Sequence, residues 1–320
     1  MAVIAGATAL GVAAFACGVV YWLGPKTGLV DRPDGDLKTH DRPVVALGGI
    51  GVLAGLLVGL WVGGEFDIGL VAAAGFIWLV GLIDDWSGLS PVVRLVAAAL
   101  AGLVVVIPAD VPDGFGAQVF WVLTVVVMVN AINLLDGLDG LAASVSVVVV
   151  AGLWAFGASQ VGVGPTIYAV SGGAMIGFLI WNWPPARLFL GDNGAYVIAL
   201  TITWLALRSS PDRMGSLLAI ALIGVPLIDL GVTVVRRLIS DKALTVGDRD
   251  HTYDRLQDSG WPVWAISVTF AVAQALWATM VLSIVARMSD GMAVISSAAV
   301  GAVAIVTVGY LMSRGSAEGA

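Results

Sequence analysis

Long apolar runs follow one another along almost the whole chain, with only short polar segments between them. Most runs approach the roughly 17–25 residues that a helix needs to cross a bilayer core of about 30 Å. Of the 320 residues, 59% are hydrophobic and only 12% are charged, which is far from the balance of a soluble domain. Because helices satisfy their own backbone hydrogen bonds without water, the pattern predicts an all-α bundle that spans a lipid bilayer.

The apolar runs predict about eleven transmembrane helices in a polytopic membrane protein. No polar segment between them is long enough for a separate soluble domain, so residues 1–320 are expected to form one domain. The expected limits of the spans are 2–23, 45–62, 68–83, 91–107, 119–135, 140–158, 163–181, 194–208, 215–235, 262–286 and 291–312.

Arginine and lysine are distributed unequally between the segments that connect these spans. If the first span runs from outside to inside, only Arg208, Arg213 and Arg287 fall on the outer side. The positive-inside rule then predicts an outer N-terminus and a cytoplasmic C-terminus in the plasma membrane. The same orientation places the 31–43, 182–192 and 236–260 segments in the cytoplasm and the 109–117 segment outside.

Composition excludes two other classes of site. The net charge of −7 arises mainly from loop carboxylates, so a nucleic-acid partner is not expected. Cys17 is the only cysteine, which excludes an intramolecular disulfide and a thiolate metal cage.

Gly51, Gly55 and Gly59 recur at the spacing of one helix face, and they predict a seam where another helix packs closely.

Four polar clusters interrupt the apolar pattern, and all four fall on the predicted cytoplasmic side. They are Asp84-Asp85 and the 130–140, 189–194 and 248–251 segments. Charged groups at membrane depth are costly, so a chain keeps them there mainly for work on ions or substrates. Carboxylates and asparagines gathered at one face suit a hard divalent cation and a phosphorylated substrate.

Each cluster also has a structural interpretation. Asp84 and Asp85 could be helix-end charges that meet water, and Asp192 could be an ordinary cap of the next helix. The 130–140 segment is more specific, because Asn130 and Asn133 share a helical face and glycines near the two aspartates let the backbone approach a ligand.

Taken in order, these segments resemble the polyprenyl-phosphate N-acetylhexosamine-1-phosphate transferases, which are integral membrane enzymes. The matching stretches are Asp31-Arg32-Pro33 with Lys38-Thr39-His40, Asp84-Asp85, the 130–141 segment, Phe189-Leu190-Gly191-Asp192 and the His251 segment. The resemblance implies transfer of a sugar 1-phosphate from a UDP-sugar to undecaprenyl or decaprenyl phosphate, with release of UMP and with Mg²⁺, or Mn²⁺, as cofactor. Eleven spans with a cytoplasmic C-terminus resemble the N-acetylglucosamine branch of the family more than the muramoyl-pentapeptide branch. The oligomeric state is open, with a homodimer as one option.

The resemblance also implies a role for individual positions. Asn133 and Asp192 match the magnesium ligands, and Asp139 matches the residue that reads the uracil edge. Asp84 and Asp85 match the pair near the lipid phosphate, with Asp85 as a base or a phosphate-orienting group, and His251 matches a catalytic histidine beside the diphosphate. Further substrate contacts are expected at Lys38, His40, Arg94, Asp136, Arg249 and Arg255.

The last motif departs from the family, which usually has two more histidines where this chain has Tyr253 and Asp254. A carboxylate at Asp254 is expected to weaken diphosphate binding unless it meets a cation or a sugar hydroxyl. Three alternatives follow: a different sugar, an altered catalytic geometry, or a silent homologue that binds the lipid or the nucleotide as a scaffold. An ion-coupled transporter is a further alternative, although it would place its charges near the middle of the bilayer and show two related halves.

Overall fold

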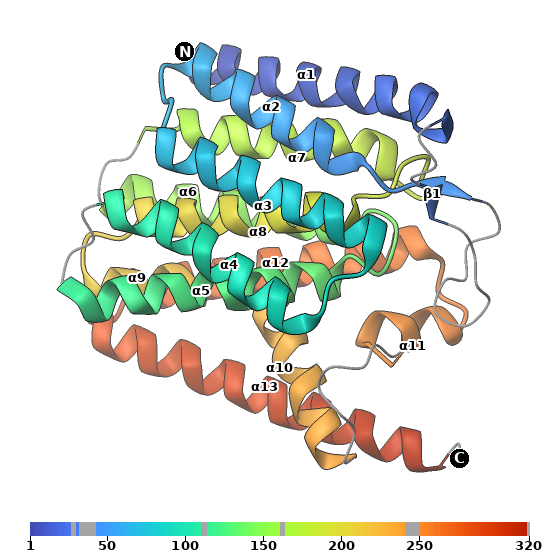
Figure 1. Ribbon diagram of the computed structural model, residues 1–320. Helices are drawn as coiled ribbons and strands as arrows, with labels where there is room; N and C mark the ends of the chain where they lie inside the picture. The colour runs from blue at the N-terminus through green and yellow to red at the C-terminus, as the bar shows by residue number, and fades with distance from the viewer. Residues whose placement is uncertain (27–29, 32–42, 110–113, 161–163, 241–249, 319–320) are drawn as a thin grey trace.

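The protein is a bundle of thirteen α-helices over the part of the chain that the structure describes (Figure 1). The computed structural model describes residues 1–26, 30–31, 43–109, 114–160, 164–240 and 250–318. The helices are α1 (Ala2–Leu23), α2 (Gly48–Gly63), α3 (Ile68–Ser87), α4 (Pro91–Val106), α5 (Gly114–Leu135), α6 (Leu141–Gln160), α7 (Thr166–Asn182), α8 (Gly191–Arg208), α9 (Arg213–Ala221), α10 (Gly224–Ile239), α11 (Thr252–Asp258), α12 (Val263–Val285) and α13 (Asp290–Glu318). Single turns of 3₁₀-helix follow α1 at Gly24–Lys26 and α4 at Ile107–Ala109.

The multi-pass membrane fold is confirmed, whereas the count of eleven spans and the orientation stay predictions. Among the described residues, seven helices are long and apolar enough to cross a membrane by themselves, and the bent pair α9–α10 makes an eighth. Two further apolar helices, α2 and α7, are shorter. Each predicted span nevertheless coincides with a helix or, in one case, with two helices.

Helix α8 forms the centre of the bundle. Every residue from Asn193 to Leu207 is buried, and α8 packs against α3, α5, α2 and α6. A helix that is enclosed on all sides has little freedom to shift, because protein interiors are close-packed. The first turn of α8, which begins at Gly191, is therefore held in a fixed position at one end of the bundle.

The predicted glycine seam on α2 is confirmed. A Cβ atom added to Gly51 would lie 2.2 Å from the Cys17 sulfur, and one added to Gly55 would lie 2.6 Å from the Ala9 carbonyl oxygen. Both contacts are with α1, so the small residues let the two helix backbones approach closely. Cys17 is buried there as a free thiol, as expected for a small apolar residue.

The span expected over 215–235 is bent. This segment is two helices, α9 and α10, that meet at an angle of 76°. Pro226 cannot donate a backbone hydrogen bond to Leu222, so the helix is interrupted there. Gln274 of α12 satisfies the freed groups, since its Nε2 donates to the Leu222 carbonyl (2.8 Å) and its Oε1 accepts from the Val225 N–H (2.8 Å). The bend directs α10 obliquely to the other helices, toward the end of the bundle that holds α11 (Figure 1).

A short antiparallel ribbon, which the sequence did not predict, closes the same end of the bundle. It pairs β1 (Val30–Asp31) with β2 (Val44–Val45). The segment before α8 extends this pairing, because the Phe189 N–H donates to the Val45 carbonyl (2.9 Å) and the Gly48 N–H donates to the Phe189 carbonyl (2.9 Å). These bonds tie the starts of α2 and α8 together.

Candidate active site

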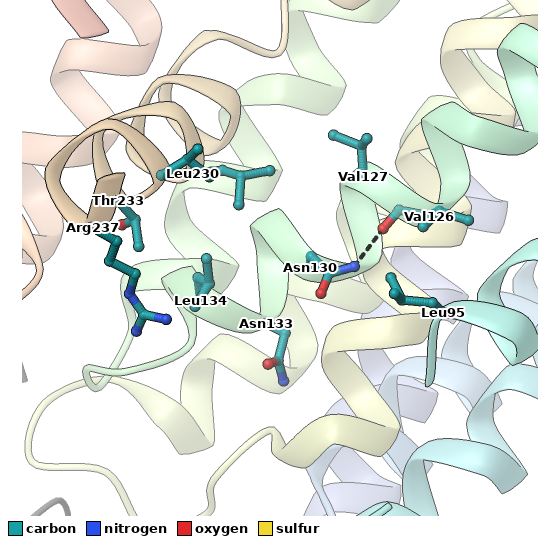
Figure 2. Close-up of a pocket in the computed structure, with 10 residues that line it drawn as sticks. Leu95, Val126, Val127, Asn130, Asn133, Leu134, Leu230, Thr233 and Arg237 are labelled. Atoms are coloured by element: carbon teal, nitrogen blue, oxygen red, sulfur yellow. Dashed lines mark hydrogen bonds between the residues drawn. The ribbon is translucent and has the colours of Figure 1, made fainter. Parts of the chain in front are cut away.

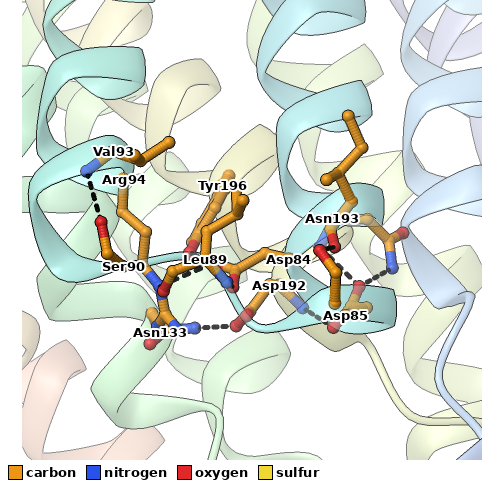
Figure 3. A network of polar contacts seen from close by, with 12 residues as sticks. Asp84, Asp85, Leu89, Ser90, Val93, Arg94, Asn133, Asp192, Asn193 and Tyr196 are labelled. Carbon is orange, nitrogen blue, oxygen red and sulfur yellow. Dashed lines mark hydrogen bonds and ion pairs between the residues drawn. The ribbon is translucent and has the colours of Figure 1, made fainter.

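The ends of α3 and α5 meet the start of α8 in a polar cluster at one end of the bundle (Figure 3). Asp85 lies at one side of it and accepts hydrogen bonds on both carboxylate oxygens (Figure 3). Oδ1 accepts from the Asp192 N–H (2.8 Å), and Oδ2 accepts from the Asn193 N–H (3.1 Å) and from the Asn193 side-chain amide (2.6 Å). Asp85 therefore holds the first turn of α8, where backbone N–H groups lack partners within the helix.

Two glycines make this close approach feasible. Gly191 has a φ of 75°, and a Cβ atom there would lie 2.6 Å from the Ala46 carbonyl oxygen and 2.9 Å from Asp85 Oδ2. A Cβ atom on Gly81 would lie 2.5 Å from the Asn193 Cα. Any larger residue at either position would push α8 away from α3, and with it Asp192.

Asp84 is buried and is held by three groups. Its Oδ2 accepts a hydrogen bond from the Tyr196 hydroxyl (2.7 Å) and lies 2.8 Å from Arg94 Nε, while its Oδ1 accepts from the Leu89 N–H (2.7 Å). The Arg94 side chain stays 35% exposed, so this guanidinium lies at the edge of the cluster. The structure thus joins Asp84 and Arg94, which the sequence assigned to separate contacts.

The two predicted metal ligands lie side by side. The Asn133 side-chain amide, at the end of α5, donates to Asp192 Oδ1 at the start of α8. They therefore present a carboxylate and a neighbouring amide, which are hard-oxygen donors.

The loop between α5 and α6 carries Asp136 and Asp139. Burial raises the pKa of Asp136 well above its usual range, and the negative charges of Asp192, Asp85 and Asp139 raise it further. Asp139 Oδ2 accepts a hydrogen bond from the Ala186 N–H (2.8 Å), so this carboxylate also fixes the segment before α8.

An apolar groove of about 300 Å³ runs beside the cluster between α4, α5 and α10 (Figure 2). Asn133 lines both the groove and the polar cluster. Thr233 and Arg237 from α10 add polar groups to the lining, and the sequence did not predict them because neither lies in one of the four polar clusters. The remaining lining residues are Leu95, Val126, Val127, Asn130, Leu134, Leu230 and Val234.

The altered histidine segment packs against the end of α5. Tyr253 stacks on the His251 ring, with centroids 5.1 Å apart and planes at 8°, and its hydroxyl donates to the Leu134 carbonyl (2.8 Å). Asp254 turns back along α11, and its Oδ2 accepts from the His251 N–H (3.1 Å). The structure therefore gives Asp254 a capping contact that was not expected.

Of the other residues predicted to contact the substrate, Arg255 lies in the described part of the chain and three do not. Arg255 binds Asp250 through Nε (2.8 Å) and Nη2 (2.7 Å), and Arg236 binds the other oxygen of Asp250 (3.0 Å). Lys38, His40 and Arg249 lie outside the described residues.

The donor set fits a magnesium ion. No group of three or more histidine, cysteine, aspartate or glutamate side chains gathers as a metal cage within the described ranges. Magnesium commonly uses one or two protein ligands and fills its other positions with water and phosphate oxygens, so Asn133 and Asp192 suffice. Besides burial, the negative charges of neighbouring carboxylates raise the pKa of Asp136, and a divalent cation would relieve that repulsion.

Comparison with known proteins agrees with this geometry. The chain is 27% identical over 275 residues to the "Probable undecaprenyl-phosphate N-acetylglucosaminyl 1-phosphate transferase" of Bacillus subtilis, covering 76% of this chain and 73% of the relative. It is 29% identical over 267 residues to the undecaprenyl-phosphate alpha-N-acetylglucosaminyl 1-phosphate transferase of Thermotoga maritima, covering 81% and 84%. It is 27% identical over 336 residues to the decaprenyl-phosphate N-acetylglucosaminephosphotransferase of Mycobacterium tuberculosis, covering 86% and 82%.

A family model, described as glycosyl transferase family 4, matches residues 68–210. The match runs from the start of α3 to just past the end of α8, and so it includes Asp85, Asn133 and Asp192. The chain belongs to glycosyl transferase family 4, the family of the polyprenyl-phosphate N-acetylhexosamine-1-phosphate transferases.

Proposed function

We propose that this protein transfers a sugar 1-phosphate from a UDP-sugar to polyprenyl phosphate and releases UMP. The observation that carries the proposal is the position of Asn133, which lies in the polar cluster with Asp192 and also lines the apolar groove. A water-soluble donor and a lipid acceptor can meet only where a polar site and a hydrophobic groove adjoin. The names of the relatives, which include undecaprenyl- and decaprenyl-phosphate transferases, support this pairing of substrates.

The reaction exchanges one phosphoanhydride bond for another. An oxygen of the polyprenyl phosphate forms a bond to the phosphorus that bears the sugar, while the bond from that phosphorus to the bridging oxygen breaks. The bridging oxygen leaves with UMP and keeps the electron pair. Both reactants are anionic, so positive groups must offset their repulsion before the phosphates can meet.

The chain supplies these groups on two sides of the cluster. Arg94 lies at its edge beside Asp84, and Arg237 lines the groove on α10. Asn133 and Asp192 would hold a magnesium ion, or manganese in its place. When bound, the ion would supply positive charge to the diphosphate of the donor.

Asp85 is an orienting residue in this proposal. Its three hydrogen bonds to Asp192 and Asn193 fix the position of the proposed metal ligand. To act as a base, Asp85 would have to lose one or more of these hydrogen bonds.

The proposal includes eleven spans, an outer N-terminus and a site at the cytoplasmic face of the plasma membrane. Its support is the asymmetry of the basic residues together with the arrangement of the clusters, which gather at one end of the bundle (Figure 1). All of the proposed site residues come from one chain, so the proposal holds for a monomer and for a homodimer. Clustering at one end also argues against a transporter, whose charges belong near the bilayer midplane.

The sugar is expected to be an N-acetylhexosamine, and a radiolabel assay tests this expectation. Purified protein in nanodiscs is given a panel of labelled UDP-sugars with undecaprenyl or decaprenyl phosphate and Mg²⁺. We expect lipid-extractable label and an equal amount of UMP from at least one UDP-N-acetylhexosamine, and neither with Asp192→Asn. If no UDP-sugar yields labelled lipid while the nucleotide still binds, the scaffold interpretation replaces the transferase.

A further inference from the structure

Asp229 is a buried carboxylate to which the proposed reaction has so far assigned no role. It lies on α10 with 5% of its surface exposed, and its Oδ2 has no hydrogen-bond partner within 3.5 Å among the described residues. The Nδ1 of His251 lies 3.6 Å from this oxygen, and that side chain is also buried. A buried carboxylate oxygen without a hydrogen bond is costly, so its retention beside a histidine needs a reason.

The histidine ring is held on one edge and on one face. Thr233 follows Asp229 by four residues on the same face of α10, and its hydroxyl lies 3.2 Å from the same Nδ1. Tyr253 covers a face of the ring, with the two planes almost parallel. Because Nδ1 is surrounded by Asp229 and Thr233, Nε2 is the ring nitrogen left for a substrate.

The bend between α9 and α10 is what brings Asp229 to this position. A straight continuation of α9 would not direct α10 toward the end of the bundle that holds α11, and Gln274 of α12 maintains the bend through Leu222 and Val225. The pairing of Asp229 with His251 therefore depends on a feature of the fold that lies away from the polar cluster.

We propose that Asp229 is a positioning residue for His251: it keeps a hydrogen on Nδ1 and thereby presents Nε2 to the phosphate groups of the substrates. A histidine nitrogen that faces a carboxylate carries its hydrogen there, and this fixes both the tautomer and the orientation of the ring. The role in presenting Nε2 rests on the proposed transferase function, whereas the position of the hydrogen does not.

The first experiment examines the hydrogen directly and needs no turnover. Protein labelled with ¹⁵N-histidine, without a histidine tag and in a His40→Gln background, contains His251 as its only labelled residue. The ¹⁵N shifts of the ring separate hydrogen on Nδ1 from hydrogen on Nε2. In the wild-type protein we expect the hydrogen on Nδ1. Asp229→Leu removes the carboxylate acceptor, so this preference should be lost, and Asp229→Glu should restore it. An unchanged spectrum in Asp229→Leu would overturn the proposal.

The second experiment is a double-mutant cycle on transfer. Asp229→Leu should lower kcat by about tenfold in the wild-type background and cause no further loss when His251 is already alanine. Tyr168→Phe is the matched control, because it removes a buried polar contact away from α10, between the Tyr168 hydroxyl and Ser209 Oγ (2.7 Å), and any loss of transfer should be the same factor in both backgrounds. Equal losses from Asp229→Leu with and without His251 would mean a merely structural role.

The two experiments fail in different ways. If the wild-type protein transfers no sugar phosphate, the proposed function is wrong, and the ¹⁵N spectra still decide whether Asp229 sets the tautomer. Should Asp229→Leu fail to fold, as judged by gel filtration, Asp229→Asn takes its place in both experiments, because it keeps the shape and removes the charge.

Discussion

Replacing Asp85 by asparagine tests whether Asp85 acts as a base or holds the first turn of α8 in place. The carboxylate accepts three hydrogen bonds, one on Oδ1 and two on Oδ2. An amide has one acceptor oxygen, so at least one of these bonds is lost and an NH₂ group then faces an N–H donor. A hydrogen bond to a charged group contributes about 1.5–3 kcal/mol, and the two that remain weaken because the acceptor becomes neutral.

We therefore expect Asp85→Asn to lose about 3 kcal/mol of stability. At the roughly 2–4 °C per kcal/mol typical of large domains, the melting temperature in detergent should fall by about 6–12 °C. Transfer should fall by about a hundredfold, because Asp192 moves with the first turn of α8. The assay pairs the melting curve with turnover and with the magnesium concentration that gives half-maximal rate, which should rise.

Asp212→Asn is the matched control. Asp212 caps the start of α9, where its Oδ1 accepts from the Gly215 N–H (2.8 Å), beyond the end of α8 that is remote from Asp85. Asparagine is an equally good cap, so this variant should keep both its stability and its transfer activity. A melting temperature for Asp85→Asn equal to that of the wild type, with transfer abolished, would refute the holding role and favour Asp85 as a base.

Three further predictions concern the metal, the tyrosine and the orientation. Asp192→Asn should abolish transfer without unfolding the protein, because one anionic oxygen is lost from a site with two protein ligands; full turnover at ordinary magnesium would instead favour a helix-cap role. Tyr253→Phe keeps the stacking on His251 and removes the bond to the Leu134 carbonyl, so transfer should fall about fivefold, the equivalent of roughly 1 kcal/mol, and an unaltered rate would show that this bond does not position the loop. In a Cys17→Ala background, an impermeant thiol reagent should label Glu65→Cys in intact cells and Ser87→Cys only after permeabilisation; labelling of both from one side would contradict the predicted orientation.

The sequence alone could predict the helices and most of the cluster, and the physical reason is the same for both. Apolar runs of membrane length and costly charges at their ends are patterns within short stretches, so they need no knowledge of the tertiary structure. The bend at Leu222 was missed because the backbone groups left free near Pro226 need hydrogen-bond partners. Gln274 supplies these partners, and it lies 52 residues from Leu222 along the chain. Asp229 was missed for the same reason, since that bend brings it to His251, which lies just before α11.

The departure at Tyr253 and Asp254 illustrates how a substitution within a motif can change the support of a site. On sequence alone, a carboxylate at Asp254 was expected to disturb an anionic substrate. In the structure, its Oδ2 accepts the His251 N–H and so stabilises the start of α11, while Tyr253 joins the same turn to the end of α5. Asp254→His should therefore cost about 1 kcal/mol of stability through the lost cap, rather than strengthen nucleotide binding. A tighter UDP-sugar complex in that variant, measured by equilibrium binding with unchanged melting temperature, would show that the carboxylate does act on the diphosphate.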